Sequence, residues 1–208
     1  MKSASYDNLL SGSMTFKSRV FSADRPRFEK LATGQSPKVT FLTCSDSRID
    51  PCALTGAAAG DLFVIRNAGN IVPEGNSGTS GELATLEFAV RALETEHVVV
   101  CGHTDCGAMK GLLAPEKCAH LSHVSSWVRQ AQGALIALDG AAQDPQLRLQ
   151  RVIEANVRLQ LENLRNLDFV REAEEAGKLH LHGWLFDISQ GEVSVMDEAA
   201  TDDLKRAA

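Results

Sequence analysis

Residues 38–48 read KVTFLTCSDSR, and residues 97–108 read HVVVCGHTDCGA. Each stretch opens with a short run of apolar and β-branched residues, which predicts a buried strand. The first run ends at Cys44, and the second ends just before His103 and Cys106. Because the carboxyl ends of adjacent parallel strands meet at one edge of a sheet, we expect these three side chains to lie close together.

The rest of the sequence alternates between strand and helix patterns. Gly177 follows the longest helical pattern and is a typical helix end. The alternation predicts an α/β fold in which a mostly parallel sheet is flanked by helices. Further strands are predicted at residues 61–66, 179–187 and 192–196, and helices at residues 82–94 and 145–176.

The first part of the chain differs in composition from the rest. Residues 1–33 are polar and mixed, with a weak helical pattern only at 25–32, and a turn cluster follows them. We interpret residues 1–33 as an N-terminal helical arm, and residues 34–208 as a single domain. A chain of 208 residues is long enough for one such domain with a full hydrophobic core.

Composition and charge exclude several classes of protein. The formal net charge is −6, whereas nucleic-acid binders and proteins of anionic membrane surfaces usually carry a basic surplus. No apolar run approaches the roughly 20 residues that span a bilayer, so no membrane insertion is expected. The N-terminal residues lack the pattern of a signal peptide, which predicts a cytoplasmic location. The five cysteines are an odd number, which argues against a disulfide framework.

The types of the three converging residues suit a metal ion. Two thiolates and one imidazole form a ligand set that favours zinc, and three protein ligands leave a fourth position free, as in catalytic sites. Asp46 and Arg48 follow Cys44 closely and could form an ion pair beside the metal, which would keep the carboxylate ionised. The alternatives are that both cysteines and the histidine only pack in the interior, and that Asp46 is an ordinary turn residue.

The segments CSDSR at 44–48 and HTDCG at 103–107 resemble the two signature motifs of the β-class carbonic anhydrases. Family-like sequence continues on both sides of these motifs, and the resemblance covers about residues 25 to 196. Five further segments carry it: GQSPK at 34–38, LTG at 54–56, GDLF at 60–63, RNAGN at 66–70 and LHGW at 181–184.

The resemblance implies an enzyme that hydrates carbon dioxide reversibly to bicarbonate and a proton. One zinc ion per chain would be held by Cys44, His103 and Cys106, and a hydroxide at the fourth position would attack the substrate. Asp46 would orient that hydroxide, and Arg48 would hold Asp46 in place. Family members usually assemble as homodimers or homotetramers.

The resemblance also implies residues that contact the substrate. Gln35 matches a glutamine that orients the substrate, typically across a dimer interface. Gly107 either lets the backbone approach the metal loop or starts the next helix. The residues at positions that line an apolar carbon dioxide pocket are Phe63, Ala68 and Phe88. Core packing alone would also explain the two phenylalanines, and Gln35 could be only a turn residue.

Some family members have an inhibitory bicarbonate site that includes a tryptophan, a glycine and a tyrosine. The matching positions here hold Phe41, Thr43 and Phe186. This difference predicts a zinc position that stays open to water and is not closed by Asp46.

Other functions are compatible with the same sequence. The scaffold could hydrolyse a related molecule, such as carbonyl sulfide or carbon disulfide. It could also be a non-catalytic zinc-binding scaffold protein, or Cys44 and Cys106 could form a redox pair.

Overall fold

The computed structural model describes residues 4–75, 78, 80–138 and 144–196, so the outer ends of the predicted arm and domain lie outside the described residues. The described residues form two compact units that divide between Ser36 and Pro37. The first unit contains α1 (Ala4–Phe16), a π-helical turn η1 (Lys17–Phe21) and α2 (Arg25–Leu31). Aromatic rings pack against one another in this unit: Phe28 lies 5.6 Å from Phe16 and 5.3 Å from Phe21 between ring centroids.

The predicted N-terminal helical arm is confirmed, and its helices extend beyond the segment at 25–32 that the sequence pattern favours. Helix α1 lacks a clear apolar period because serine, glycine and asparagine interrupt its apolar residues. The large apolar side chains that it does carry, such as Leu9 and Met14, are mostly exposed within this unit.

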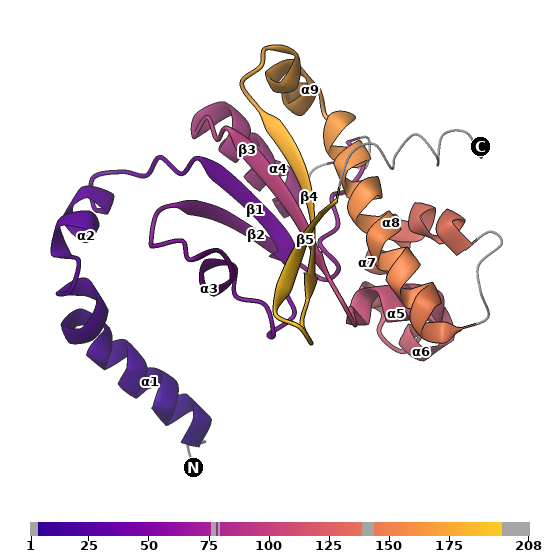
Figure 1. Cartoon of the computed structure of the whole chain (residues 1–208), viewed down its shortest axis with the longest axis horizontal. Helices are drawn as coiled ribbons and strands as arrows, with labels where there is room; N and C mark the ends of the chain where they lie inside the picture. Colours follow the sequence, from indigo (N-terminus) through magenta and orange to yellow (C-terminus); the bar gives the residue numbers. More distant parts are fainter. Residues whose placement is uncertain (1–3, 76–77, 79, 139–143, 197–208) are drawn as a thin grey trace. The chain divides into compact units, whose positions relative to one another are not determined.

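The second unit is built on one five-stranded sheet with the strand order β2-β1-β3-β4-β5 (Figure 1). The first four strands in this order are parallel, and β5 pairs with β4 in the antiparallel direction. The predicted α/β fold with a mostly parallel sheet is therefore confirmed. The strands are β1 (Val39–Cys44), β2 (Leu62–Asn67), β3 (His97–His103), β4 (His180–Asp187) and β5 (Glu192–Met196).

The register of the sheet brings the carboxyl ends of three strands to the same edge. Cys44 pairs with Asn67 at the ends of β1 and β2. On the other side of β1, Thr43 pairs with Cys101 of β3, so His103 lies at the same edge. The loops that follow β1, β2 and β3 therefore start next to one another, as the sequence predicts for adjacent parallel strands.

Helices and helical turns connect the strands. Helix α3 (Pro51–Thr55) connects β1 to β2. Helix α4 (Gly81–Glu87) and a π-helical turn η2 (Phe88–Ala92) lie between β2 and β3. After β3 come α5 (Gly107–Leu113), α6 (Pro115–Cys118), α7 (Ser122–Val128) and a 3₁₀ segment η3 (Arg129–Leu138). Before β4 come α8 (Pro145–Arg165) and α9 (Asp168–Glu175). In the described part of the chain, no helix is long and apolar enough to span a bilayer.

The helical region predicted over 145–176 consists of two helices, α8 and α9, with a short interruption between them. Asn166 ends α8, and Leu167 has an extended backbone. The interruption lets Leu167 and Val170 turn toward the core, where both are buried. Gly177 has φ of +66°, the left-handed conformation expected of a residue that follows a helix end.

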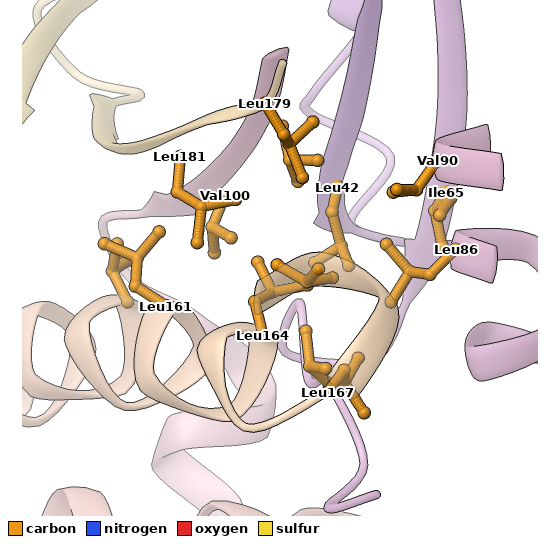
Figure 2. Packing of buried hydrophobic residues seen from close by; sticks show 14 residues of the cluster. Leu42, Ile65, Leu86, Val90, Val100, Leu161, Leu164, Leu167, Leu179 and Leu181 are labelled. Atoms are coloured by element: carbon orange, nitrogen blue, oxygen red, sulfur yellow. The ribbon is translucent and has the colours of Figure 1, made fainter. Parts of the chain in front are cut away.

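Both faces of the sheet are buried near its centre. On one face, Leu42, Val98 and Val100 pack against α8, and Figure 2 shows Leu161 and Leu164 of α8 pointing toward these strands. On the other face, Phe41, Val99 and Cys101 pack against Leu54 of α3 and against Trp184. Burial on both faces explains why the central strands are almost continuously apolar.

Candidate metal centre

Three side chains that are distant in sequence converge at the carboxyl edge of the sheet. Cys44 is the last residue of β1, His103 is the last residue of β3, and Cys106 immediately precedes α5. Their ligand atoms all lie within 4.8 Å of one another, and the three residues are 6%, 0% and 1% exposed. Within the described residues, this is the only group of three or more such side chains that could hold a metal ion.

The imidazole of His103 has a defined orientation. Its Nδ1 lies 2.8 Å from the carbonyl oxygen of Thr104, which can only accept a hydrogen bond, so Nδ1 must be the protonated nitrogen. In the neutral ring, Nε2 then presents a lone pair. This Nε2 is buried, and none of the described residues forms a hydrogen bond with it. A buried acceptor without a partner is costly in free energy, and a metal ion would satisfy it.

The two thiols differ in their protonation because they share one small buried space. A hydrogen bond from Cys106 lowers the pKa of Cys44 to about 4, despite burial, with further hydrogen bonds from the Gly69 and Asp46 backbone. The same contact and burial raise the pKa of Cys106, because a second thiolate would lie beside the first in a desolvated space. Two adjacent thiolates therefore require a cation between them.

This set of donors fits zinc. Zinc ligands at about 2.0–2.3 Å from one ion lie within about 4 Å of each other, so small side-chain movements suffice here. Two sulfur donors, one imidazole nitrogen and almost complete burial are typical of a site for a borderline-soft divalent ion.

Asp46 and Arg48 form the ion pair that the sequence suggests. Arg48 Nη2 donates to Asp46 Oδ2 at 2.7 Å, and Arg48 Nε donates to Asp46 Oδ1 at 2.9 Å. The Arg48 backbone N–H also donates to Oδ1 at 3.0 Å. These contacts hold the pKa of Asp46 well below its usual range. Asp46 Oδ2 lies 4.0 Å from His103 Nε2, so the ionised carboxylate faces the cluster.

Two charged residues that the sequence reasoning does not single out hold this loop. Asp105 accepts a hydrogen bond from Arg48 Nη1 at 3.0 Å and also contacts Lys110, so it anchors Arg48 from the His103 loop. Arg66 donates from Nε to the Cys44 carbonyl at 3.1 Å and from Nη2 to the Asp46 carbonyl at 2.7 Å. Both residues stand within the quoted motifs, but sequence alone does not indicate these partners.

The loop after β2 approaches Cys44 from its other side. The Gly69 N–H donates to Cys44 Sγ at 3.3 Å. Gly69 has φ of +85°, and a Cβ at this residue would lie 2.9 Å from the Cβ of Ala108 in α5. Both the backbone conformation and the close approach therefore require glycine here.

The structure does not bring the predicted pocket aromatics to the cluster within one chain. Phe63 pairs with Thr40, four residues before Cys44 along β1, which corresponds to about 13 Å. Phe88 packs near Phe63, with 6.1 Å between ring centroids, and is 48% exposed. The two rings therefore form a separate, partly exposed apolar pair.

The other predicted substrate residues have different surroundings. Ala68 lies beside Gly69, and its carbonyl accepts a hydrogen bond from Trp127 at 2.8 Å. Gly107 starts α5, and a Cβ there would meet no described atom within 4 Å, so of its two predicted roles the helix start is the one observed. Gln35 is exposed and belongs to the first unit, and its substrate role stays a prediction.

The positions that match the inhibitory site are occupied by packing residues. Phe41 is buried and contacts Trp184 edge-on, with 5.8 Å between ring centroids. Thr43 donates from its hydroxyl to the Cys101 carbonyl at 2.8 Å. Phe186 is half-buried and packs near Phe41 and Cys101.

Comparison with known proteins identifies relatives across nearly the whole chain. The family model described as carbonic anhydrase matches residues 39–193. A carbonic anhydrase of Synechococcus elongatus is 40% identical over 198 residues, which cover 94% of this chain and 73% of that protein. A carbonic anhydrase of Pseudomonas aeruginosa is also 40% identical, over 195 residues that cover 93% of this chain and 88% of that protein.

Solved structures agree with these relatives. The β-carbonic anhydrase CcaA superposes with a TM-score of 0.91 at 38% identity, and the match covers 95% of this chain and 97% of that chain. One of two tetrameric β-carbonic anhydrases from Sordaria macrospora superposes with a TM-score of 0.84 at 29% identity, covering 93% of this chain and 98% of that chain. The fold, the cluster at the sheet edge and these similarities together show that the chain belongs to the β-class carbonic anhydrases.

Proposed function

We propose that this carbonic anhydrase catalyses the reversible hydration of carbon dioxide with one zinc ion held by Cys44, His103 and Cys106. The observation that carries the proposal is the buried cluster of two thiols and an unpaired imidazole nitrogen beside an ionised carboxylate. A bound zinc ion would act as a Lewis acid that lowers the pKa of a water molecule and so supplies the nucleophile.

The residues around the cluster position that water. Asp46 stays ionised and can accept a hydrogen bond from the water, which leaves a lone pair of its oxygen directed at the substrate carbon. Arg48 fixes the carboxylate through two side-chain hydrogen bonds, and Asp105 in turn fixes Arg48. While Arg48 holds Asp46 in this way, the carboxylate does not need to occupy the fourth ligand position, which favours an open site.

Assembly would complete the substrate pocket. Phe63 and Phe88 lie away from the cluster of their own chain and are partly exposed, so they are available to a second copy. Exposed apolar side chains on α1 also favour contact with a second copy. The relatives from Sordaria macrospora are tetrameric, and we propose a homodimer or homotetramer in which Gln35 and the two aromatics serve the neighbouring site.

We place the enzyme in the cytoplasm, where thiols remain reduced. All five cysteines are free, and two of them would have to stay reduced to bind zinc. Substrate and product are the small molecules carbon dioxide and bicarbonate.

The decisive test is stopped-flow hydration of carbon dioxide combined with zinc analysis, on the wild type and on Asp46→Ala. We expect about one zinc per chain in both proteins, and a fall in kcat/KM of about 100-fold or more in the variant, because an oriented proton acceptor typically contributes that much. Glu96→Ala is the matched control, since it removes an ion-paired carboxylate at the opposite end of the same sheet.

Full activity of Asp46→Ala would contradict the role of Asp46, and a zinc-free active wild type would contradict the metal centre. Gas-release assays of the wild type with carbonyl sulfide and carbon disulfide test the alternative substrates. Turnover of these molecules without hydration of carbon dioxide would assign the alternative substrate class.

The hydration rate is expected to rise toward alkaline pH. The attacking water must lose a proton, and two thiolate ligands neutralise more of the zinc charge than neutral histidines would. Asp46 does not cause this dependence, because Arg48 holds its pKa below the usual range and it is already ionised at acidic pH. A profile of kcat/KM from acidic to alkaline pH measures the effect, and a flat profile would count against it.

A further inference from the structure

One peptide group links the indole of Trp127 to the sulfur of Cys44. The peptide between Ala68 and Gly69 donates its N–H to Cys44 Sγ at 3.3 Å. Its carbonyl oxygen, on Ala68, accepts a hydrogen bond from the indole Nε1 of Trp127 at 2.8 Å. The carbonyl and the N–H of a planar trans peptide point in opposite directions. The indole therefore bonds one end of this rigid peptide group, and the thiolate bonds the other end.

The next peptide group is held from α8. Asn156 Nδ2 donates to the Gly69 carbonyl at 3.0 Å, and both residues are buried. Asn156 Oδ1 accepts a hydrogen bond from Gln160 Nε2 at 2.8 Å. Gln160 Oε1 in turn accepts from the backbone N–H of Val72 at 2.8 Å and from Asn163 Nδ2.

The side-chain amides on this face of α8 are buried, although amide side chains usually lie at the protein surface. Asn156, Gln160 and Asn163 recur at the spacing of one helix face, and all three are buried beside the apolar residues of α8. Buried amides are costly unless they are hydrogen-bonded, and here the three side chains bond the loop backbone and one another. The loop at 69–72 is therefore fixed by α8, and not only by the strand that precedes it.

We propose that Trp127 and Asn156 are positioning residues that aim the Gly69 N–H at the Cys44 thiolate and thereby set how strongly this sulfur donates electrons to zinc. The inference rests on the proposed zinc centre. A hydrogen bond to sulfur withdraws negative charge from it, and a chain of hydrogen bonds from the indole through the peptide strengthens this effect. The thiolate then neutralises less of the metal charge, which favours ionisation of the water.

Trp127→Phe tests the inference because it removes the indole donor and keeps an aromatic ring. Trp184→Phe is the matched control, since it makes the same change on the opposite face of the sheet, against Phe41. Both proteins and the wild type are loaded with cobalt(II) in place of zinc, and their absorption spectra are compared. We expect the thiolate-to-cobalt charge-transfer band of Trp127→Phe to move to lower energy, while that of Trp184→Phe stays at the wild-type position.

The zinc-loaded proteins give a second readout. The midpoint of the pH–rate profile is expected to move to higher pH in Trp127→Phe, by up to about one pH unit if the contribution of a single hydrogen bond is lost. A role limited to stability would lower the amount of folded enzyme without moving this midpoint.

Asn156→Ala and Asn163→Ala form an independent pair from α8. Both remove a buried amide from the same network, but only Asn156 bonds Gly69, so only Asn156→Ala should move the cobalt band. If Asn156→Ala does not fold, the cobalt band and the pH midpoint of Trp127→Phe still test the inference.

Two results would overturn the inference: an unchanged band and midpoint in Trp127→Phe, or equal shifts in Trp184→Phe. If the wild type takes up metal and hydrates carbon dioxide while Trp127→Phe is unchanged, the proposed function stands and only this inference fails. If the wild type takes up neither zinc nor cobalt, the metal centre is wrong and the inference fails with it.

Discussion

Cys106→Ser is expected to release the zinc ion and to abolish hydration of carbon dioxide. A serine hydroxyl does not ionise at neutral pH and is a poor zinc ligand, so the site would keep only Cys44 and His103. Loss of a residue that merely supports a ligand typically weakens metal binding by 10–100-fold, and loss of a ligand itself should exceed about 100-fold. Zinc per chain after dialysis, together with stopped-flow rates, measures the result.

Cys101→Ser is the matched control for this change. Cys101 is also fully buried, five residues before Cys106, but burial raises its pKa to about 12 and keeps it a thiol. The control should retain one zinc per chain and most of the activity. Stoichiometric zinc in Cys106→Ser would show that Cys106 is not a ligand.

The same proteins separate the metal centre from a redox pair of Cys44 and Cys106. Under reducing conditions, a chelator should inactivate the wild type without oxidising either thiol. Inactivation that requires an oxidant, with no effect of the chelator, would favour the redox interpretation.

Leu164→Ala should cause a large loss of stability without touching the metal centre. Leu164 is fully buried where α8 meets the sheet, and Figure 2 shows it close to Leu42 and Leu167. Removing a buried leucine side chain typically costs about 2–5 kcal/mol, because apolar contacts are lost and a cavity remains. Urea unfolding at a fixed zinc concentration would measure the free energy of unfolding, since bound metal also contributes to stability.

Leu121→Ala makes the same chemical change at a residue that is 45% exposed. It should lower the free energy of unfolding by less than about 1 kcal/mol, as is usual for surface positions. Equal effects of the two substitutions would mean that α8 does not pack on the sheet as described.

The part of the fold that carries the ligands could be predicted because its signals are local. The apolar runs before Cys44 and His103 indicate strands, and the two motifs place ligands directly at the strand ends. Parallel pairing of these strands then brings their carboxyl ends to one edge of the sheet. Asp46 and Arg48 are only two residues apart, so their ion pair is also a local feature.

The support of the site could not be predicted in this way, because it depends on contacts between distant segments. Asn156 and Gln160 have the composition of a solvent-exposed helix face, yet they are buried against a loop nearly 90 residues earlier in the chain. Trp127 reaches Ala68 from α7, and nothing near either residue in the sequence indicates this contact.

The break between α8 and α9 cannot be predicted from the sequence for a related reason. No proline or glycine marks it, and the chain turns at Asn166 because burial of Leu167 and Val170 outweighs the continuation of the helix. Tertiary packing overrides the local helical preference at this point.

The strand order has a consequence for how the chain acquires its native structure during synthesis. The earliest strand, β1, lies inside the sheet, and β2 and β3 then add to its two sides, followed by β4 and β5 outward from β3. Each strand can thus join an open edge as it leaves the ribosome, at about 5–20 residues per second, without separating strands already paired. Cys44 and His103 end β1 and β3, so both candidate ligand loops can form once β3 has paired, before α8, which fixes the loop at 69–72, has been translated.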